Sequence, residues 1–445
     1  MTEESSNNND DSNNNDRLIE TGDIPIPILS SKEVSVRETP LGQGGFCTVS
    51  AIYKFNLNYN DDNDANNTAI SSTPTQILRR QAFTKQFDSY QQKYYDPKNI
   101  RLPGQGPIVE HPSIQKPPRV ALKRVKASLK NNYREKWQNG VNDLMNEIKI
   151  LSKCSHPNII TLYAVGYDDD NDDYDNNNNE NNDTHKMNKK CNILYNFAII
   201  DQLKSTLRNK IYKWNEDKTM NFLPFAKMKK ANNESWLERL VIMVKVADAL
   251  QYLHSRGIIH RDIHPENIGF SYDNDMVKLF DFGLATCCTK KTIGDKMTTD
   301  IVHNSINADN DNELFDLTNE TGTIRYMAPE VAMGLPYGFK VDVYSLGLVL
   351  HETLSLRKPF LGIKDPQLFR NEVMMGGLRP TLYDYWPKRI CNLVDRMWAN
   401  DVASRPSSKE VVNILSDLLR EGDDVDLYPI GKFDGWKSNF TYQFW

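Results

Sequence analysis

The sequence predicts an α+β protein with two lobes, the first rich in strands and the second rich in helices. Its 445 residues, of which 39% are hydrophobic, can bury two cores, because domains commonly hold ~100 to 200 residues. Short apolar runs that are typical of strands lie in the first half, and apolar residues at helical spacing dominate the second. Long polar insertions interrupt the strand-rich half.

Asn-, Asp- and Ser-rich stretches set the expected limits of the folded part. Residues 1–23 are too polar to offset the entropy of ordering them, and we expect a disordered tail over 1–35. The same composition returns within 56–118 and 168–190, which we interpret as insertions at hairpin tips, because the cost of loop closure grows slowly with length. Residues 421–445 are expected to form a C-terminal tail.

The strand-rich half has five clear signals, namely one turn, three strands and one helix. A glycine-rich turn runs from Leu41 to Val49, and a strand that ends near Phe55 follows it. Val-Ala-Leu-Lys at 120–123 and Ala-Ile-Ile at 198–200 read as further strands. Between these two strands, a helix is indicated by apolar residues that recur every three or four positions, namely Val141, Leu144, Met145, Ile148 and Leu151.

The helical half begins with a capping signal. Ser235 and, three residues later, Glu238 form the pattern of a capping box at a helix start. The helix that they would open has a buried side made of Leu237, Leu240, Val244, Ala247, Leu250 and Leu253.

Composition and the N-terminus bound the class of protein. A formal charge of −5 and 25% charged residues are ordinary, so no nucleic-acid partner is expected. Neither a signal sequence nor ~18 uninterrupted apolar residues is present, and the six cysteines lack metal-ligand spacing. We expect a soluble cytoplasmic or nuclear protein with no membrane partner.

Two motifs place a base and two magnesium ligands at the spacing that phosphoryl transfer requires. They are His-Arg-Asp-Ile-His-Pro-Glu-Asn at 260–267 and Asp-Phe-Gly at 281–283. The glycine-rich turn, Val-Ala-Leu-Lys at 120–123 and Ala-Pro-Glu at 328–330 complete the set in the same chain order. From about Val36 to Leu419, the chain thus resembles eukaryotic protein kinases of the Ser/Thr type, with the tyrosine-kinase-like group as the nearest subgroup.

The resemblance implies a two-lobed protein kinase fold. Its N-lobe would span 36–203 and its C-lobe 204–420, with an activation segment at 281–330 and a hinge near Asp201 to Leu203. The substrates would be ATP and Ser/Thr hydroxyls of proteins, with Mg²⁺ as the metal. The alternative is a pseudokinase or a scaffolding module that binds nucleotide. A second rival is a protein that self-associates through its Asn-rich tracts.

The resemblance also assigns the reacting groups. Asp262 would accept or orient the proton of the substrate hydroxyl, and Asn267 and Asp281 would hold magnesium. Lys123 would contact the nucleotide phosphates, with Glu147 holding it in place. Glu135 is the runner-up for that glutamate, but it lies at the helix start.

The nucleotide-binding residues carried over from the family lie in the glycine-rich turn, the lysine strand and the hinge. They are Leu41, Gly42, Gln43, Gly44, Gly45, Phe46, Cys47, Thr48, Val49, Ala121, Lys123, Asp201 and Leu203.

Three positions depart from the family pattern. Cys47 replaces the third glycine, and Gly269 replaces an apolar residue that usually lies beneath the adenine. His264 replaces the lysine that touches the transferred phosphate. We expect His264 to act in its protonated form, with a pKa above the reference ~6.5 because of the neighbouring phosphate, so that it joins the catalytic residues. The alternative is that His264 is a spacer.

Further family roles are structural or regulatory. Glu330 would pair with Arg405, and Asp342 would brace the catalytic loop. Leu151, Leu162, His260 and Phe282 would stack between the lobes.

Arg261 would bind a phosphorylated residue of the activation segment, added by an upstream kinase or by autophosphorylation. The candidates are Thr286, Thr289, Thr292, Thr298, Thr299, Ser305 and Thr318. The sequence does not choose among them.

Overall fold

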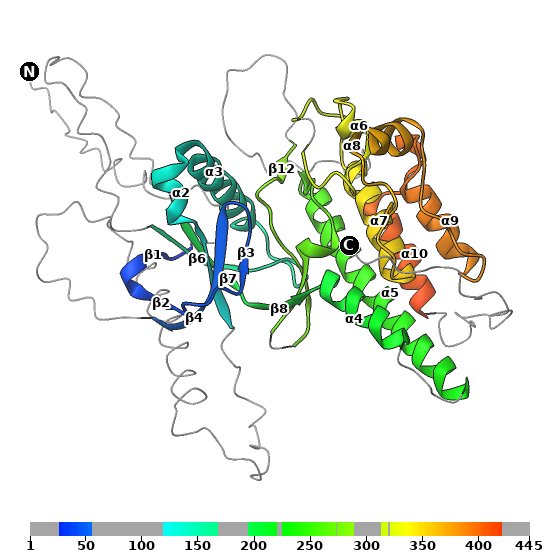
Figure 1. Ribbon diagram of the computed structural model, residues 1–445, viewed down its shortest axis with the longest axis horizontal. Helices are drawn as coiled ribbons and strands as arrows, with labels where there is room; N and C mark the ends of the chain where they lie inside the picture. The colour runs from blue at the N-terminus through cyan, green and yellow to red at the C-terminus, as the bar shows by residue number, and fades with distance from the viewer. Residues whose placement is uncertain are drawn as a thin grey trace, which may run out of the picture.

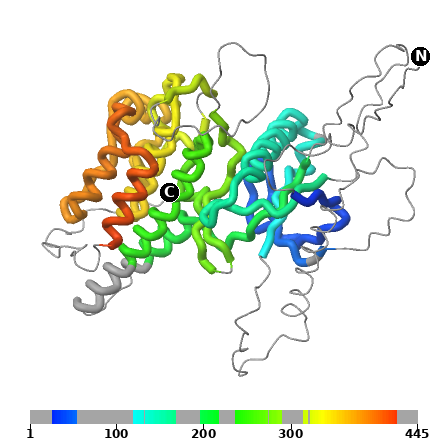
Figure 2. The backbone as a smooth tube through the Cα atoms, turned by 180° about the vertical axis from the view of Figure 1, so that it is seen from behind, coloured from blue at the N-terminus to red at the C-terminus, as the bar shows by residue number. Residues whose placement is uncertain are grey.

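The computed structural model describes residues 26–55, 119–167, 195–219, 225–272, 274–288, 313–318 and 321–420. Its first lobe is a curled sheet flanked by two helices, and its second lobe is mainly helical (Figure 1). Figure 2 shows the two lobes side by side from behind. The α+β, two-lobed architecture expected from the sequence is therefore confirmed.

The sheet of the first lobe has the strand order β1-β6-β7-β5-β4-β2, and β3 pairs with β4. Its strands are β1 (Ile28–Ser30), β2 (Val34–Val36), β3 (Gly42–Gln43), β4 (Cys47–Phe55), β5 (Val120–Val125), β6 (Leu162–Tyr167) and β7 (Phe197–Asp201). The helices beside it are α2 (Ala127–Asn132) and α3 (Arg134–Leu151). The apolar repeat of α3 is buried as expected, although Met145 is only partly covered.

The strand β1 corrects the expected tail over 1–35. It pairs in parallel with β6, and Leu29 lies opposite Gly166 with only 2% of its surface exposed. A Cβ at Gly166 would lie 2.3 Å from the Leu29 carbonyl oxygen, so glycine is what admits this strand. A short turn leads from β1 to β2. In this turn the Glu33 carboxylate accepts a hydrogen bond from the backbone N–H of Ser30 at 2.8 Å. Residues 1–25 lie outside the described part.

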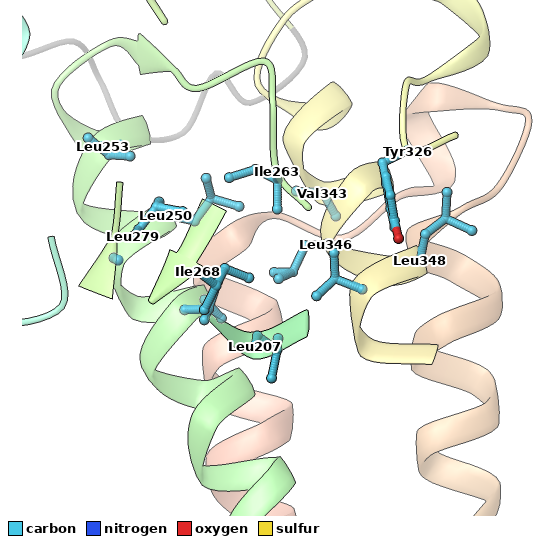
Figure 3. Packing of buried hydrophobic residues seen from close by; sticks show 14 of the residues in the cluster. Leu207, Leu250, Leu253, Ile263, Ile268, Leu279, Tyr326, Val343, Leu346 and Leu348 are labelled. Carbon is cyan, nitrogen blue, oxygen red and sulfur yellow. The ribbon is translucent and has the colours of Figure 1, made fainter. Parts of the chain in front are cut away.

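The second lobe is built around the long helix α5. Its helices are α4 (Leu207–Thr219), α5 (Phe225–Ser255), α6 (Pro329–Ala332), α7 (Lys340–Ser355), α8 (Pro366–Phe369), α9 (Lys388–Met397) and α10 (Ser408–Arg420), with a π-helical turn at Arg370–Met375. Its short strands are β8 (Leu203–Thr206), β9 (Ile258–Ile259), β10 (Ile268–Ser271), β11 (Val277–Leu279) and β12 (Thr286–Cys287). Residues from α4, α5, α7, β10 and β11 meet in one apolar core (Figure 3).

The capping box expected at Ser235 is wrong. Helix α5 begins ten residues earlier, at Phe225, so Ser235 lies inside it, and its hydroxyl accepts a 2.8 Å hydrogen bond from Arg239. The preceding turns contain alanine, lysine and methionine, which favour the helix and let it extend past the apparent start signal.

The chain passes between the lobes at Gln202. Strand β7 ends at Asp201 in the first sheet, and Leu203 already pairs with Ser271 of β10 in the second lobe. Leu203 thus belongs to the C-lobe, one residue before the expected boundary. The insertions expected at 56–118 and 168–190 lie outside the described residues, and β4 ends at Phe55 as expected. Among the described residues, no helix is both long and apolar enough to cross a membrane.

The packing of β1 leads to a stability prediction. Leu29→Ala should lower the free energy of unfolding by about 3 kcal/mol, because it leaves a cavity in the apolar cluster that Leu29 forms with Phe55 and Phe197 in the N-lobe. The same change at Leu361, which is 66% exposed, should cost less than about 0.5 kcal/mol. Urea denaturation of both variants and the parent checks this. Equal midpoints for the two variants would show that β1 does not support the lobe.

Candidate active site

Lys123 lies at the centre of the site. It projects from β5, and its Nζ lies 2.5 Å from Glu147 Oε2 on α3 and 3.0 Å from Asp281 Oδ1 after β11. Burial alone would lower the pKa of Lys123, but the two carboxylates outweigh it and raise that pKa above its ordinary value. The lysine therefore stays charged and links three segments of the chain. Glu135, the alternative partner, is exposed at the start of α3.

Asn146, next to Glu147, is a residue that the sequence analysis missed. Its side-chain amide donates to the carbonyl oxygens of Gly283 at 2.9 Å, Ala285 at 2.8 Å and Phe282 at 3.3 Å. These bonds tie α3 to the backbone of the Asp-Phe-Gly segment. No sequence signal separates Asn146 from an ordinary surface asparagine of a helix.

Asp342 of α7 holds the backbone of the catalytic loop, residues 260–267. This carboxylate is fully buried and accepts hydrogen bonds from the backbone N–H groups of His260 and Arg261, both at 2.8 Å. Its Oδ2 is also 3.0 Å from His254 Nε2. The loop passes through a left-handed conformation at Arg261, with φ of 66°. The expected bracing role of Asp342 is confirmed.

Asp262 stands at the end of that turn with both carboxylate oxygens engaged. Oδ1 accepts from the Thr323 backbone N–H at 2.8 Å, and Oδ2 accepts from Asn267 Nδ2 at 3.1 Å. Burial raises the pKa of Asp262, but hydrogen bonds from His264 and Thr323 outweigh it and lower that pKa. Asp262 is thus an ionised acceptor, suited to orienting a hydroxyl rather than to strong proton abstraction.

His264 bridges two carboxylates. Its Nε2 lies 3.2 Å from Asp262 Oδ2 and its Nδ1 lies 3.0 Å from Glu266 Oε2. Burial lowers the pKa of His264, but these two partners outweigh it and raise that pKa to about 9. Only the doubly protonated ring can donate to both carboxylates, so the 3.3 Å approach of the Glu266 N–H to Nδ1 is not a hydrogen bond in this state. The pKa rises as expected, and carboxylates of the chain are sufficient to raise it.

Asp281 and Asn267 present the oxygen atoms expected of magnesium ligands. Lys123 holds the pKa of Asp281 below its usual range, and nearly half of the Asp281 side chain, 48%, is exposed. The amide nitrogen of Asn267 donates to the backbone oxygen and Oδ2 of Asp262, both at 3.1 Å. That orientation leaves the amide oxygen of Asn267 without a donor among the described residues. Carboxylate and amide oxygens suit a hard cation that keeps water and substrate oxygens as its other ligands.

The glycine-rich turn lies beside the strand of Lys123, because Val49 pairs with Lys123 in the sheet. Gly42 and Gln43 form β3, and the backbone N–H of Leu41 donates to the Val49 carbonyl at 2.7 Å. A Cβ added at Gly42 or Gly45 would meet nothing within 4 Å. These glycines are exposed, and packing inside the protein does not require them.

The remaining residues expected in the turn have distinct surroundings. Thr48 lies opposite Gln43 in the β3–β4 pair, and Phe46 packs against Gly140 of α3, where a Cβ would lie 2.7 Å from the Phe46 Cβ. Burial raises the pKa of Cys47 to about 11, so the thiol that replaces the third glycine is neutral.

Asp201 at the hinge and Ala121 on the lysine strand were both expected near the nucleotide. The Asp201 carboxylate accepts from the Thr161 N–H and the Tyr163 hydroxyl, both at 2.8 Å, and lies 3.2 Å from Lys278 Nζ. The Asp201 side chain therefore anchors the end of β7, and a role of this residue in nucleotide binding stays a prediction. Ala121 is buried on the same face of β5 as Lys123.

A second ionic cluster contacts the catalytic loop next to His264. Arg208 of α4 donates to Glu266 at 2.7 Å and to the Tyr326 hydroxyl at 2.7 Å, and it also pairs with buried Glu352 of α7. The Tyr326 ring stacks on His264 at a centroid distance of 5.9 Å. The sequence analysis did not find this cluster, because its members come from four distant segments.

The expected structural pairs are present. Arg405 binds Glu330 through two hydrogen bonds of 2.6 and 3.0 Å, as the family pattern implied. The rings of His260 and Phe282 are in contact at 4.8 Å, and both side chains are fully buried. Leu151 is buried and Leu162 partly buried in the same core.

Comparison with known proteins places the chain. The protein kinase domain model matches residues 106–415, more than half of the 445 residues. Mitogen-activated protein kinase kinase kinase 7 of Bos taurus is 33% identical over 202 residues, which cover 44% of this chain and 31% of that protein. Serine/threonine-protein kinase STY46 of Arabidopsis thaliana is 32% identical over 180 residues, which cover 40% of this chain and 27% of that protein.

The matched part thus spans about a third or less of each relative's length. The family model covers the catalytic loop, the Asp-Phe-Gly segment and the strand of Lys123, whose side chains meet in one site. On the match and the geometry together, the chain belongs to the protein kinase domain family.

Proposed function

We propose that this protein is a serine/threonine protein kinase, which transfers the γ-phosphate of ATP to hydroxyl groups of protein substrates. ATP-dependent phosphotransfer is what the family implies. The observation that carries the proposal is the meeting of Lys123, Glu147 and Asp281 next to a catalytic loop whose Asp262 is ionised. The pseudokinase alternative gains no support, because the residues whose loss would indicate it are all present, namely Lys123, Asp262, Asn267 and Asp281.

The chain's own groups divide the work. Lys123 supplies a fixed positive charge for the nucleotide phosphates, and Glu147 and Asp281 keep it charged and in place. Asp262 holds the substrate hydroxyl for attack. Asn267 and Asp281 would hold magnesium, which neutralises phosphate charge when bound.

Two features favour serine and threonine as acceptors. The segment Thr-Gly-Thr-Ile-Arg-Tyr-Met at 321–327 resembles the substrate-docking loop of Ser/Thr kinases, and Thr323 in it donates its N–H to Asp262 at 2.8 Å. Both relatives cited above are named protein kinases, and one is named a serine/threonine kinase. Membership of the tyrosine-kinase-like group and the compartment stay predictions.

Removal of the two central charged groups tests the proposal. Asp262→Asn and Lys123→Met should each lower kcat by at least about a thousandfold, because both residues act on the reacting groups. The melting temperature should stay within a few degrees of the parent for Asp262→Asn, whereas Lys123→Met should also lower it, because that change leaves buried Glu147 without its charge partner. Phosphate incorporation into a Ser/Thr peptide and a thermal melt measure the two quantities. Substantial activity in either variant would remove that residue from the catalytic set.

A pH series tests whether His264 acts as a cation. Its folded pKa of about 9 exceeds the unfolded value of 6.5, so the imidazolium and its stabilising contacts are fully present below pH 6.5 and are lost as the pH rises through 9. Lysine keeps its charge to about pH 10. The kcat ratio of His264→Lys to the parent should stay constant to about pH 8 and grow about fourfold by pH 9.5.

The neutral variant His264→Gln is the matched control. It should be slower than the parent at pH 7 and approach it above pH 9, where the parent has lost the same charge. If both ratios are independent of pH, His264 is a spacer, and magnesium and Lys123 supply the charge.

Regulation by phosphorylation centres on Thr318. Of the seven candidates, only Thr286 and Thr318 lie among the described residues; Thr289, Thr292, Thr298, Thr299 and Ser305 lie outside them. The exposed Thr318 hydroxyl accepts a 2.7 Å hydrogen bond from Arg261 Nη1. A phosphate there would face a guanidinium that also binds the Leu284 carbonyl at 2.6 Å.

We therefore expect phosphorylation of Thr318, by an upstream kinase or by the protein itself, to raise activity. Thr318→Val should lower kcat about tenfold relative to the phosphorylated parent. Thr286→Val, at the other described candidate, should leave kcat within about twofold. Mass spectrometry of the phosphorylated protein together with these rates checks the assignment, which fails if Thr286→Val is the slow variant.

A further inference from the structure

Strand β1 and the residues just before it contribute to two separate apolar clusters. Ile26 is buried in the main apolar core, and Ile28 packs against that core and is partly buried. Leu29 belongs instead to the cluster that it forms with Phe55 and Phe197. Successive side chains of a strand point to opposite faces of a sheet, which explains the division. The segment therefore adds apolar surface to both faces of the N-lobe sheet.

The face that holds Ile26 and Ile28 is the one on which α3 lies. Val165 of β6 and Ala198 of β7 belong to the same core, and α3 contacts both of these strands and β5. Ala198 lies opposite Lys123 in the pair of β7 with β5, so both side chains point to this face. The segment of β1 thus extends, beyond β6, the surface that supports α3.

Strand β1 has little freedom to slide along β6. The backbone N–H of Val165 donates to the Pro27 carbonyl at 3.0 Å, and Ile28 lies opposite Val165 in the parallel pair. Only the three residues Ser31–Glu33 join β1 to β2, and these two strands stand at the two ends of the strand order. Strand β2 in turn pairs with β4. The short turn therefore fixes β1 on β6 while β2 is held by β4.

We propose that Ile26 and Ile28 are positioning residues for phosphotransfer, which hold α3 where Glu147 meets Lys123. The inference rests on the proposed function. Glu147 is 2% exposed and is carried by α3, and its carboxylate lies 2.5 Å from the Lys123 ammonium, so a small shift of the helix would separate the two groups. Close packing resists such a shift, and loss of apolar volume at 26 and 28 would leave space at the β6 edge of the supporting surface.

Leu29 supplies a matched comparison within the same strand. Its side chain is buried in the cluster on the other face of the sheet. Alanine at this position removes apolar volume from the lobe without opening space on the face that supports α3. Changes at Leu29 and at the two isoleucines therefore separate general destabilisation of the lobe from displacement of the helix.

Amide hydrogen exchange in the purified full-length chain tests the position of α3 without any turnover. The variant with both Ile26→Ala and Ile28→Ala should exchange the amides of α3 about tenfold faster than the parent, while those of β4 keep their rates. Leu29→Ala should leave α3 within about twofold and speed exchange in β4, since Phe55 of β4 lies in its cluster. Valine at both 26 and 28 keeps most of the apolar surface and should match the parent.

Turnover tests the link to the site. In the double-alanine variant, kcat for a Ser/Thr peptide should fall about tenfold with the peptide KM within about twofold, since Lys123 acts on the nucleotide phosphates. In a Glu147→Gln background, the same two changes should slow turnover by less than about threefold, because effects that act through one contact are not additive.

Three results would overturn the inference: α3 exchanging at the parent rate in the double-alanine variant, Leu29→Ala loosening α3 equally, or the full loss of kcat persisting in the Glu147→Gln background. If the double-alanine variant does not fold, Ile28→Ala alone replaces it, with changes in the same direction expected. A parent without phosphotransfer whose α3 still loosens as expected would overturn the proposed function, and would leave Ile26 and Ile28 as residues that position α3.

Discussion

The buried ammonium group of Lys123 is the constraint on which the rest of the site depends. Its side chain is 12% exposed, and taking an unpaired charge out of water costs several kcal/mol, so it must be paired. Its two partners come from α3 and from the segment after β11, which belong to different lobes. Asn146 adds hydrogen bonds between the same two segments. Pairing one lysine therefore fixes how α3, β5 and the Asp-Phe-Gly segment lie against one another.

A second buried charge, the carboxylate of Asp342, positions the catalytic loop of the C-lobe. Asp342 holds the backbone of the catalytic loop in a left-handed turn at Arg261. After this turn, Asp262 accepts a hydrogen bond from the backbone N–H of Thr323. His264 and Asn267 then both contact Asp262 from the same loop. Asp262 is thus kept ionised and oriented by hydrogen bonds. Such preorganised groups lose little free energy to rearrangement during reaction.

The sequence predicted the members of the site better than their supports. Lys123, Asp262 and Asp281 could be found because each belongs to a motif whose spacing reflects its chemistry. Asn146 and the cluster around Arg208 could not, since they join segments distant in the chain and leave no periodic signal. The same limit explains β1, a three-residue strand whose partner strand lies more than a hundred residues away. It also explains the start of α5, where helix propensity overrode a local capping pattern.

The central claim is that these groups form an active phosphotransferase rather than a pseudokinase that only binds nucleotide. The most direct measurement is phosphoamino-acid analysis after incubation of the purified chain with labelled Mg-ATP and a degenerate peptide library. The account predicts label on phosphoserine and phosphothreonine, with repeated turnover. Nucleotide binding without any labelled peptide, or label on tyrosine alone, would contradict it.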